Sequence, residues 1–96
     1  MAEFRLSKKA RQDLDDIADY TYETFGELQA DKYGEELLSA FLLLAERPRI
    51  GKAVSGLISN LRSFPFQAHV IYYNAEGNGI FIVRILHHSM DAKRHL

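Results

Sequence analysis

The chain opens on a short alternation of apolar and charged residues and then changes to a helical period. Phe4 and Leu6 alternate with Glu3 and Arg5, which predicts a short half-buried strand. Ser7 is placed as the N-cap of a helix that ends at Gly26. The apolar residues of this helix share one face: Ala10, Leu14, Ile17, Ala18, Thr21 and Phe25. Its remaining surface is acidic and carries Asp13, Asp15, Asp16, Asp19 and Glu23.

A second helical pattern runs from about Leu28 to Glu46. Its main apolar stripe consists of Tyr33, Leu37, Phe41 and Leu44, and an adjacent stripe consists of Leu38, Leu42 and Ala45. So wide an apolar arc predicts that this helix packs against two surfaces, the first helix and a sheet. Pro48 ends the pattern, and residues 47–52 form a basic loop.

Three strand-like runs occupy the second half of the chain, at residues 61–66, 69–73 and 80–86. Residues 74–79 are rich in types that tolerate positive φ, which predicts an antiparallel hairpin between the last two runs. Pro65 suits a strand end or a sheet edge. We therefore predict a single α+β domain over residues 1–96 with the order β-α-α-β-β-β. The N-terminal strand and a three-stranded antiparallel meander share one sheet, and residues 87–96 form a tail.

Composition and charge narrow the possible functions. The formal net charge is −1 over 96 residues, but residues 1–46 carry eleven acidic and five basic side chains. Residues 47–96 carry two acidic and seven basic side chains and all four histidines. With no cysteine, the chain has no disulfide and no thiolate metal cluster, which agrees with a reducing cytosol. Its longest apolar run, residues 41–45, is too short for a bilayer, and residues 1–5 do not resemble a signal peptide, so we expect a cytoplasmic protein without a membrane partner.

Several of these residues together resemble the ParE toxins of the RelE/ParE superfamily. The likeness lies in Phe4-Arg5-Leu6-Ser7-x-x-Ala10-x-x-Asp13-Leu14-x-x-Ile17 and in Arg84-Ile85-Leu86-His87-x-x-Met90-Asp91-x-x-Arg94-His95-Leu96. Between these blocks it includes Tyr20-Thr21, Gly26, Gln29-Ala30, Tyr33, Leu61-Arg62 and His69-x-Ile71-Tyr72. The resemblance implies a bacterial toxin of a type II toxin–antitoxin pair that acts on DNA gyrase and is neutralised by a ParD-like antitoxin. It also implies a helical hairpin packed on an antiparallel sheet.

The superfamily has a second branch, the RelE-like ribosome-dependent endoribonucleases, which fold alone does not separate from ParE. Arg62 and Arg84 each interrupt an apolar strand and can hold a phosphate or a carboxylate. His87 and His88 follow the last strand, and histidine transfers protons near neutral pH. A ribonuclease would use both arginines to hold the phosphate and either His87 or His88 to transfer a proton. The structural alternative for each arginine is an ion pair with a helix carboxylate. For His87 we favour a structural or partner-contacting role over proton transfer.

The tail combines apolar Met90 and Leu96 with basic residues that suit an acidic target surface. The resemblance implies that this region contributes to toxicity. The candidate target-binding residues are Arg62, Arg84, His87, Met90, Asp91, Arg94 and His95. In a helical tail, His87, Asp91 and His95 would align at i, i+4 and i+8 and could bind a divalent metal, but we expect no metal and no cofactor. We expect His69 to be a hydrogen-bonded sheet residue.

The acidic first helix has three interpretations. It is a solvated face, a surface for the basic residues of an antitoxin arm that folds on binding, or a mimic of nucleic acid. The candidate antitoxin-binding residues are Leu14, Ile17, Tyr33, Leu38 and Leu42. We favour a gyrase inhibitor that forms a hetero-oligomer with its antitoxin and does not itself bind nucleic acid. The alternatives are a messenger-RNA endoribonuclease and an inactive homologue that only binds an antitoxin.

Overall fold

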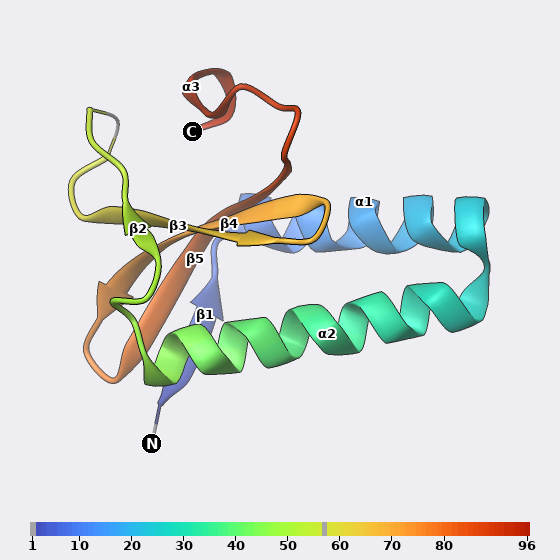
Figure 1. Cartoon of the computed structure of the whole chain (residues 1–96), viewed down its shortest axis with the longest axis horizontal. Helices are drawn as coiled ribbons and strands as arrows, with labels where there is room; N and C mark the ends of the chain where they lie inside the picture. The colour runs from blue at the N-terminus through green and yellow to red at the C-terminus, as the bar shows by residue number, and fades with distance from the viewer. Residues whose placement is uncertain (1, 57) are drawn as a thin grey trace.

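A computed structural model describes residues 2–56 and 58–96 of the chain (Figure 1). The first strand, β1 (Glu3–Leu6), is followed by two helices, α1 (Lys8–Phe25) and α2 (Glu27–Glu46). The later elements are β2 (Lys52–Ala53), β3 (Leu61–Phe66), β4 (His69–Glu76), β5 (Gly79–His87) and α3 (Ala92–His95). The predicted α+β order is therefore confirmed, and the structure adds the short elements β2 and α3.

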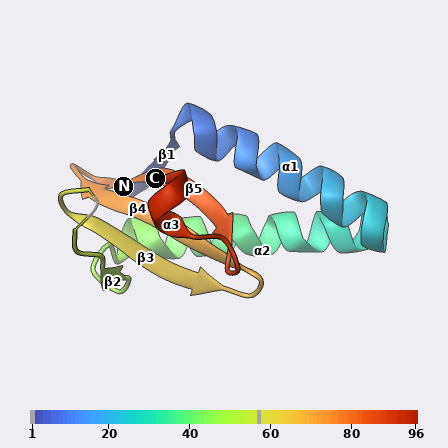
Figure 2. The same ribbon diagram turned by 90° about the horizontal axis from the view of Figure 1, so that it is seen from above.

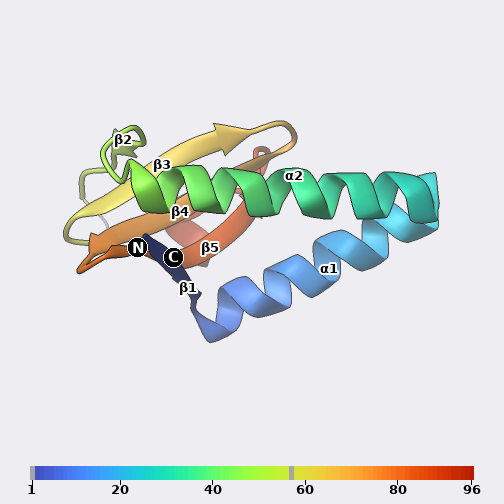
Figure 3. The same cartoon turned by 90° about the horizontal axis from the view of Figure 1, so that it is seen from below.

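The strands form one sheet in the order β1-β5-β4-β3-β2. The meander from β3 to β5 is antiparallel as predicted, whereas β1 runs parallel to β5. Figures 2 and 3 show α2 across one face of the sheet and α3 over the opposite face. The joined end of α1 and α2 projects beyond the sheet (Figure 1). None of the helices in the described ranges is both long enough and apolar enough to traverse a bilayer.

Two local features determine where the helical hairpin begins and where the chain reverses direction. The Ser7 hydroxyl accepts a hydrogen bond from the backbone N of Ala10 at 2.9 Å, so the predicted N-cap is confirmed. Gly26 separates α1 from α2 with φ of 91°, a conformation that is costly for any residue with a Cβ. A single residue can therefore reverse the chain between two long helices.

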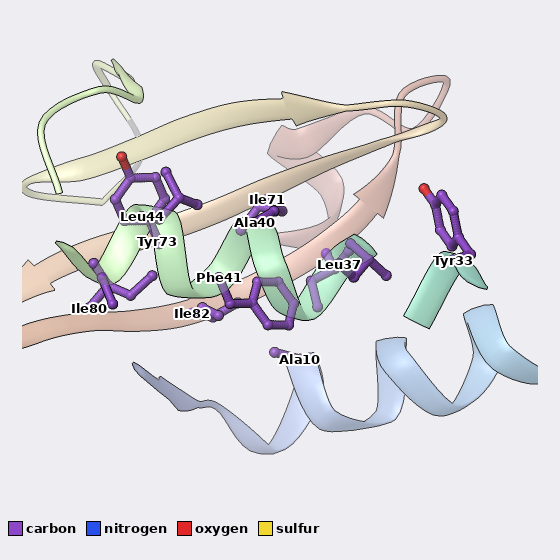
Figure 4. Close-up of a cluster of buried hydrophobic side chains, with 12 residues drawn as sticks. Ala10, Tyr33, Leu37, Ala40, Phe41, Leu44, Ile71, Tyr73, Ile80 and Ile82 are labelled. Atoms are coloured by element: carbon purple, nitrogen blue, oxygen red, sulfur yellow. The ribbon is translucent and has the colours of Figure 1, made fainter. Parts of the chain in front are cut away.

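The core lies between α2 and the sheet (Figure 4). The predicted stripe of Tyr33, Leu37, Phe41 and Leu44 is buried against strands β4 and β5. Its partners are Ile71, Tyr73, Ile80, Ile82 and Ile85. Each fully buried aliphatic or aromatic side chain contributes about 1.5–3 kcal/mol relative to exposure, so this layer supplies much of the driving force for folding.

Three expectations about the elements are wrong. Leu38 and Leu42 are each 47% exposed, because they lie on the outer side of α2, although α2 does pack against both the first helix and the sheet and Ala45 of the same stripe is buried. Phe25 is 65% exposed, because it sits at the projecting end of the hairpin. The connection between β4 and β5 comprises only residues 77–78, because Asn74 and Ala75 continue the strand by pairing with Phe81 and Ile80.

Candidate functional site

Two cavities adjoin along the side of α1 that faces the end of β5. The first has a volume of about 360 Å³ and is lined from α1, β4, β5 and the tail by Asp13, Asp16, Ile17, Tyr20, His69, Arg84, Ile85, Leu86, His87, Met90 and His95. The second, of about 290 Å³, is lined by Tyr20, Thr21, Phe25, Gln29, Tyr33, Gln67, Ala68, His69 and His87. Because three residues line both cavities, we treat the two as one depression and call it the α1 groove.

Arg84 forms part of the groove wall and joins three elements. Its Nε and Nη2 donate to the two carboxylate oxygens of Asp13 at 2.8 and 2.9 Å. Its Nη1 donates to the backbone oxygen of His95 in α3 at 2.6 Å. The two paired side chains are only 16% and 11% exposed, so water screens this ion pair weakly. The hydrogen bond with Asp13 raises the pKa of Arg84 against the opposing effect of burial.

A bulge in β5 accounts for the position of Arg84. Tyr72 pairs with Arg84 and Tyr73 pairs with Ile82, so Val83 is an extra residue on β5. On the other side of β5, β1 has already ended, and the Ser7 hydroxyl donates to the backbone oxygen of Val83 at 2.6 Å.

Asp13 also bonds to the backbone of β5, at the edge that lies beyond the end of β1. Its Oδ2 accepts a hydrogen bond from the backbone N of Ile85 at 3.0 Å. The expectation that Asp13 lies on the exposed acidic face of the first helix is therefore wrong. The carboxylate satisfies a strand edge and a guanidinium that would otherwise be buried without partners. The structural alternative for Arg84, an ion pair with a helix carboxylate, is therefore confirmed.

Three histidines cluster where β4 begins and β5 ends. The ring centroids of His69 and His87 are 5.6 Å apart, and those of His87 and His88 are 4.4 Å apart. The hydroxyl of Tyr33 lies 2.6 Å from Nδ1 of His69, in agreement with the expected hydrogen-bonded sheet residue. Burial, and then repulsion from His87 and His88, lower the pKa of His69, and Asp13 opposes this change. Burial raises the pKa of Tyr33.

Arg62 lies in a different environment and lines neither cavity of the α1 groove. Its Nη1 donates to the backbone oxygens of Gly51 at 2.7 Å and Arg49 at 3.3 Å. Arg62 therefore holds the loop after α2. Of the four candidate residues of the ribonuclease alternative, Arg84 and His87 line the groove, whereas Arg62 and His88 do not.

Only some of the candidate target-binding residues lie in the α1 groove. Arg84, His87, Met90 and His95 line the first cavity of the groove. Asp91 instead caps α3, because its Oδ1 accepts a hydrogen bond from the backbone N of Lys93 at 3.1 Å, and Arg94 is exposed.

His87, Asp91 and His95 do not align on one helix, so the arrangement considered for a metal site does not occur. His87 belongs to β5, and Asp91 is extended with φ of −77° and ψ of 111°. In the part of the chain that the structure describes, no three His, Asp or Glu side chains are arranged to hold a metal ion.

The candidate antitoxin-binding residues lie on two surfaces of the hairpin. Ile17 lines the first cavity and Tyr33 the second, while Leu14 packs against the core. Leu38 and Leu42 lie on the outer side of α2, away from the groove. An extended arm that wraps the hairpin can contact both surfaces.

Tyr20 is a groove residue that the sequence patterns did not identify. It lies at the junction of the two cavities, yet it is 64% exposed. A large aromatic residue outside the apolar stripe of an acidic helix was the available signal, because such residues often mark contact surfaces.

The chain matches known proteins over nearly its full length. Residues 4–92 match a family model described as the ParE toxin of the type II toxin–antitoxin system parDE. The chain is 38% identical over 96 residues to Toxin ParE1 of Caulobacter vibrioides, covering 100% of this chain and 99% of the relative. It is 37% identical over 94 residues to Toxin ParE1 of Mycobacterium tuberculosis, covering 97% and 96% of the two chains.

Two solved structures share the fold. A chain of the chromosomal ParDE toxin–antitoxin system of P. aeruginosa superposes with a TM-score of 0.75 at 21% identity, covering 91% of this chain and 96% of that one. A chain of the toxin–antitoxin complex RelBE2 of Mycobacterium tuberculosis superposes with a TM-score of 0.61 at 18% identity, covering 90% and 96%. At these identities the likeness concerns the fold alone.

Proposed function

The chain belongs to the ParE family of toxins of type II toxin–antitoxin systems, and we propose that it inhibits DNA gyrase and is neutralised by a ParD-like antitoxin. The free toxin acts by binding gyrase in the cytoplasm, and the neutralised toxin forms a hetero-oligomer with its antitoxin. The family match carries this proposal, and the hydrogen bonds of Arg84 favour it over the ribonuclease alternative. Asp13 balances the charge of Arg84, and three N–H groups of Arg84 already donate to protein oxygens.

A ribonuclease of the RelE type needs an arginine that is free to hold the scissile phosphate. Here Arg84 joins α1 to β5 and α3, and Arg62 holds the backbone of a loop. Both arginines therefore act as structural groups, which favours a binding protein over a nuclease. His87 and His88 are adjacent and could in principle transfer protons. Proton transfer in a ribonuclease also requires residues that position the substrate phosphate, and both arginines are occupied by protein contacts.

The α1 groove also suggests how the antitoxin neutralises the toxin. Ile17, a candidate antitoxin contact, and Met90 and His95, candidate target contacts, line the same cavity. A segment that occupies this cavity covers both sets. Apolar residues of the antitoxin enter the groove, and its basic residues lie beside exposed Asp16 and Asp19 on α1. Neutralisation is then direct exclusion of the target.

Purified toxin tests the activity in two reactions run side by side. One contains gyrase, supercoiled plasmid and ATP, and the other contains programmed ribosomes and messenger RNA. We expect cleaved DNA to accumulate while the RNA stays intact, and we expect added antitoxin to suppress the DNA cleavage. Cleaved RNA with intact DNA supports the ribonuclease, and inactivity in both reactions supports the inactive homologue.

Point variants test the antitoxin surface. Ile17→Asp places a charge in the groove, and Leu42→Asp places one on the outer side of α2. We expect each to weaken antitoxin binding by about tenfold or more, because a charge replaces a desolvated apolar contact. Ser55→Asp, at an exposed position after β2 and outside the hairpin, is the control and should bind normally. Equal affinity of all three variants contradicts the proposed surface, provided that their circular dichroism spectra are unchanged.

A further inference from the structure

The loop that follows α2 is held in one conformation by buried groups. Tyr73 of β4 is fully buried, and its hydroxyl donates to the backbone oxygen of Pro48 at 2.8 Å. The same hydroxyl accepts a hydrogen bond from the backbone N of Gly51 at 2.9 Å. Arg62 donates to the backbone oxygens of Gly51 and Arg49. A Cβ at position 51 would collide with the ring of Tyr73, so glycine is required there.

This fixed loop presents four exposed side chains, those of Arg47, Arg49, Ile50 and Lys52. Among residues 2–56 and 58–96, the carboxylate ion pairs are Arg5–Glu76 and Arg84–Asp13, so none of the three cations of the loop takes part in one. No acidic residue occurs in the sequence between Glu46 and Glu76. No carboxylate ion pair within the described residues therefore balances the positive charge of the loop.

A hollow of about 380 Å³ lies beside these cations and is lined by Arg47, Pro48, Arg49, Ile50 and Ala75. We call it the basic hollow. Its walls are apolar apart from the two arginines, and Ile50 is 45% exposed. It shares no lining residue with the α1 groove, so both can be occupied at the same time.

We propose that the basic hollow is a second docking site, for an acidic protein segment that inserts an apolar side chain against Pro48 and Ile50. Carboxylates on either side of that residue pair with Arg47, Arg49 and Lys52. Because Tyr73 and Arg62 fix the loop beforehand, little backbone entropy is lost on binding. This site is separate from the proposed antitoxin and gyrase contacts and adds a third surface to the toxin.

The apolar walls favour a protein segment over a nucleic acid. A phosphate backbone offers charge but no apolar group that fills a hollow made by Pro48, Ile50 and Ala75. A second copy of the chain offers acidic residues and exposed Tyr22, Phe25 and Leu28 at the projecting end of its hairpin. That contact would make the chain self-associate without any added partner, an outcome that the test below distinguishes from binding of a separate acidic segment.

The test uses the full-length, ¹⁵N-labelled chain titrated with three synthetic peptides. The first carries Asp and Glu around a central Leu-Phe pair, the second replaces Leu-Phe with Ser-Ser, and the third replaces the acids with their amides. We expect the first peptide to bind tightest and to shift the amides of Arg49, Ile50, Gly51, Lys52 and Ala75. The amides of His69 and His87, in the α1 groove, should not move.

Variants of the chain then separate the contribution of the loop cations to peptide binding from that of the apolar wall. Arg47→Glu with Arg49→Glu should weaken binding of the first peptide about tenfold. Lys8→Glu with Lys9→Glu causes the same change in net charge at the exposed start of α1 and should have no effect. Ile50→Ser should weaken the first peptide but not the second. If the double glutamate variant does not fold, Arg47→Gln with Arg49→Gln takes its place.

Three results would overturn the proposal. The first is an absence of shifts around the loop. The second is tighter binding of a short DNA duplex that depends on Arg47 and Arg49 but not on Ile50. The third is self-association without any peptide that the double glutamate variant abolishes. Because none of these measurements involves gyrase or antitoxin, the test stands whether or not the proposed function holds.

Discussion

Asp13 and Arg84 make the most consequential side-chain contact in the molecule. They are 71 positions apart in the chain, and their pairing also positions Ile85 and the carbonyl of His95. We expect Asp13→Ala to lower the free energy of unfolding by about 2–4 kcal/mol, because it leaves a largely buried guanidinium without its counter-charge. The midpoint of urea unfolding measures this change.

The exposed pair of Arg5 and Glu76 provides the control. Its nitrogen–oxygen distance of 2.7 Å is as short as that of the inner pair, but its side chains are 66% and 41% exposed. Solvent screens such a pair, so Glu76→Gln should leave the urea midpoint unchanged. Equal effects of the two substitutions would show that burial does not decide the strength of these contacts.

His69 makes the stability depend on pH. Burial and the neighbouring histidines lower its pKa below the ordinary value of 6.5, so the folded state takes up a proton less readily than the unfolded chain. Stability is therefore complete above pH 6.5 and is lost as the pH falls from there towards the pKa of the folded state. Urea midpoints measured from about pH 7.5 down to about pH 5 should show this loss.

Substitutions at two positions identify the source of that dependence. His69→Gln should flatten the decline at acid pH, because the titrating group is gone. Tyr33→Phe removes the hydroxyl near His69 but keeps the ring that buries it, so the slope should persist even if overall stability falls. An unchanged slope in His69→Gln would assign the pH dependence to other groups.

At the scale of elements, the hairpin depends on Gly26. Its φ of 91° is unfavourable for alanine, although nothing lies within 4 Å of the added Cβ. We expect Gly26→Ala to cost about 1–2 kcal/mol in thermal or urea unfolding, from backbone strain alone. Gly34→Ala is the matched control, because it lies inside α2 in equally open space and should stabilise by about 0.5–1 kcal/mol. Effects of the same sign would contradict this account.

The acidic face of α1 gives a second prediction at this scale. Reversing Asp15, Asp16 and Asp19 to lysine should weaken antitoxin binding by at least about tenfold, because basic residues of the arm then meet like charges. Gyrase inhibition should survive. The control reverses Glu3 and Glu76, which are exposed on the sheet rather than on either helix and lie outside both cavities of the groove. Loss of gyrase inhibition in the α1 variant would instead favour the interpretation in which the acids mimic nucleic acid.

Elements with a strong local pattern were predictable. The stripe from Tyr33 to Leu44 follows directly from helical periodicity, and Ser7 and Gly26 bound α1 where their chemistry places them. The strand β2 was missed, because two residues are too few to produce a period. The turn after β4 was predicted too long, because residues that tolerate turns, such as Asn74, also pair in strands when a neighbour is available.

At the scale of the whole molecule, the charge division becomes a division in space. The acidic residues lie along the projecting hairpin, while the basic loop lies where α2 ends against the sheet (Figure 1). The tail lies over the face of the sheet opposite α2 (Figure 2) and reaches the α1 groove through Met90 and His95. The molecule therefore carries its acidic and its basic surfaces on separate parts of the structure.

Removal of residues 90–96 tests the role of the tail. No residue of α3 is buried, but the truncation removes the His95 carbonyl that accepts a hydrogen bond from Arg84, so we expect a fall in melting temperature of about 4–8 °C. Gyrase inhibition should be lost, while antitoxin binding should persist through the second cavity and the acidic face of α1. The full-length variant Lys93→Gln with Arg94→Gln distinguishes loss of charge from loss of the tail itself. Full gyrase inhibition by the truncated chain would remove the tail from the target contacts.

The sequence by itself determined the order of the elements, the buried face of α2, the division of charge and the likeness to ParE toxins. These properties depend on residues that are close together in the chain, where periodicity and capping act. The tertiary structure alone decided that Asp13 pairs with Arg84, that Tyr73 and Arg62 fix the loop after α2, and that helix, sheet and tail enclose a groove. Such contacts depend on strand register and on the bulge at Val83, which follow from the packing of the whole chain rather than from any local pattern.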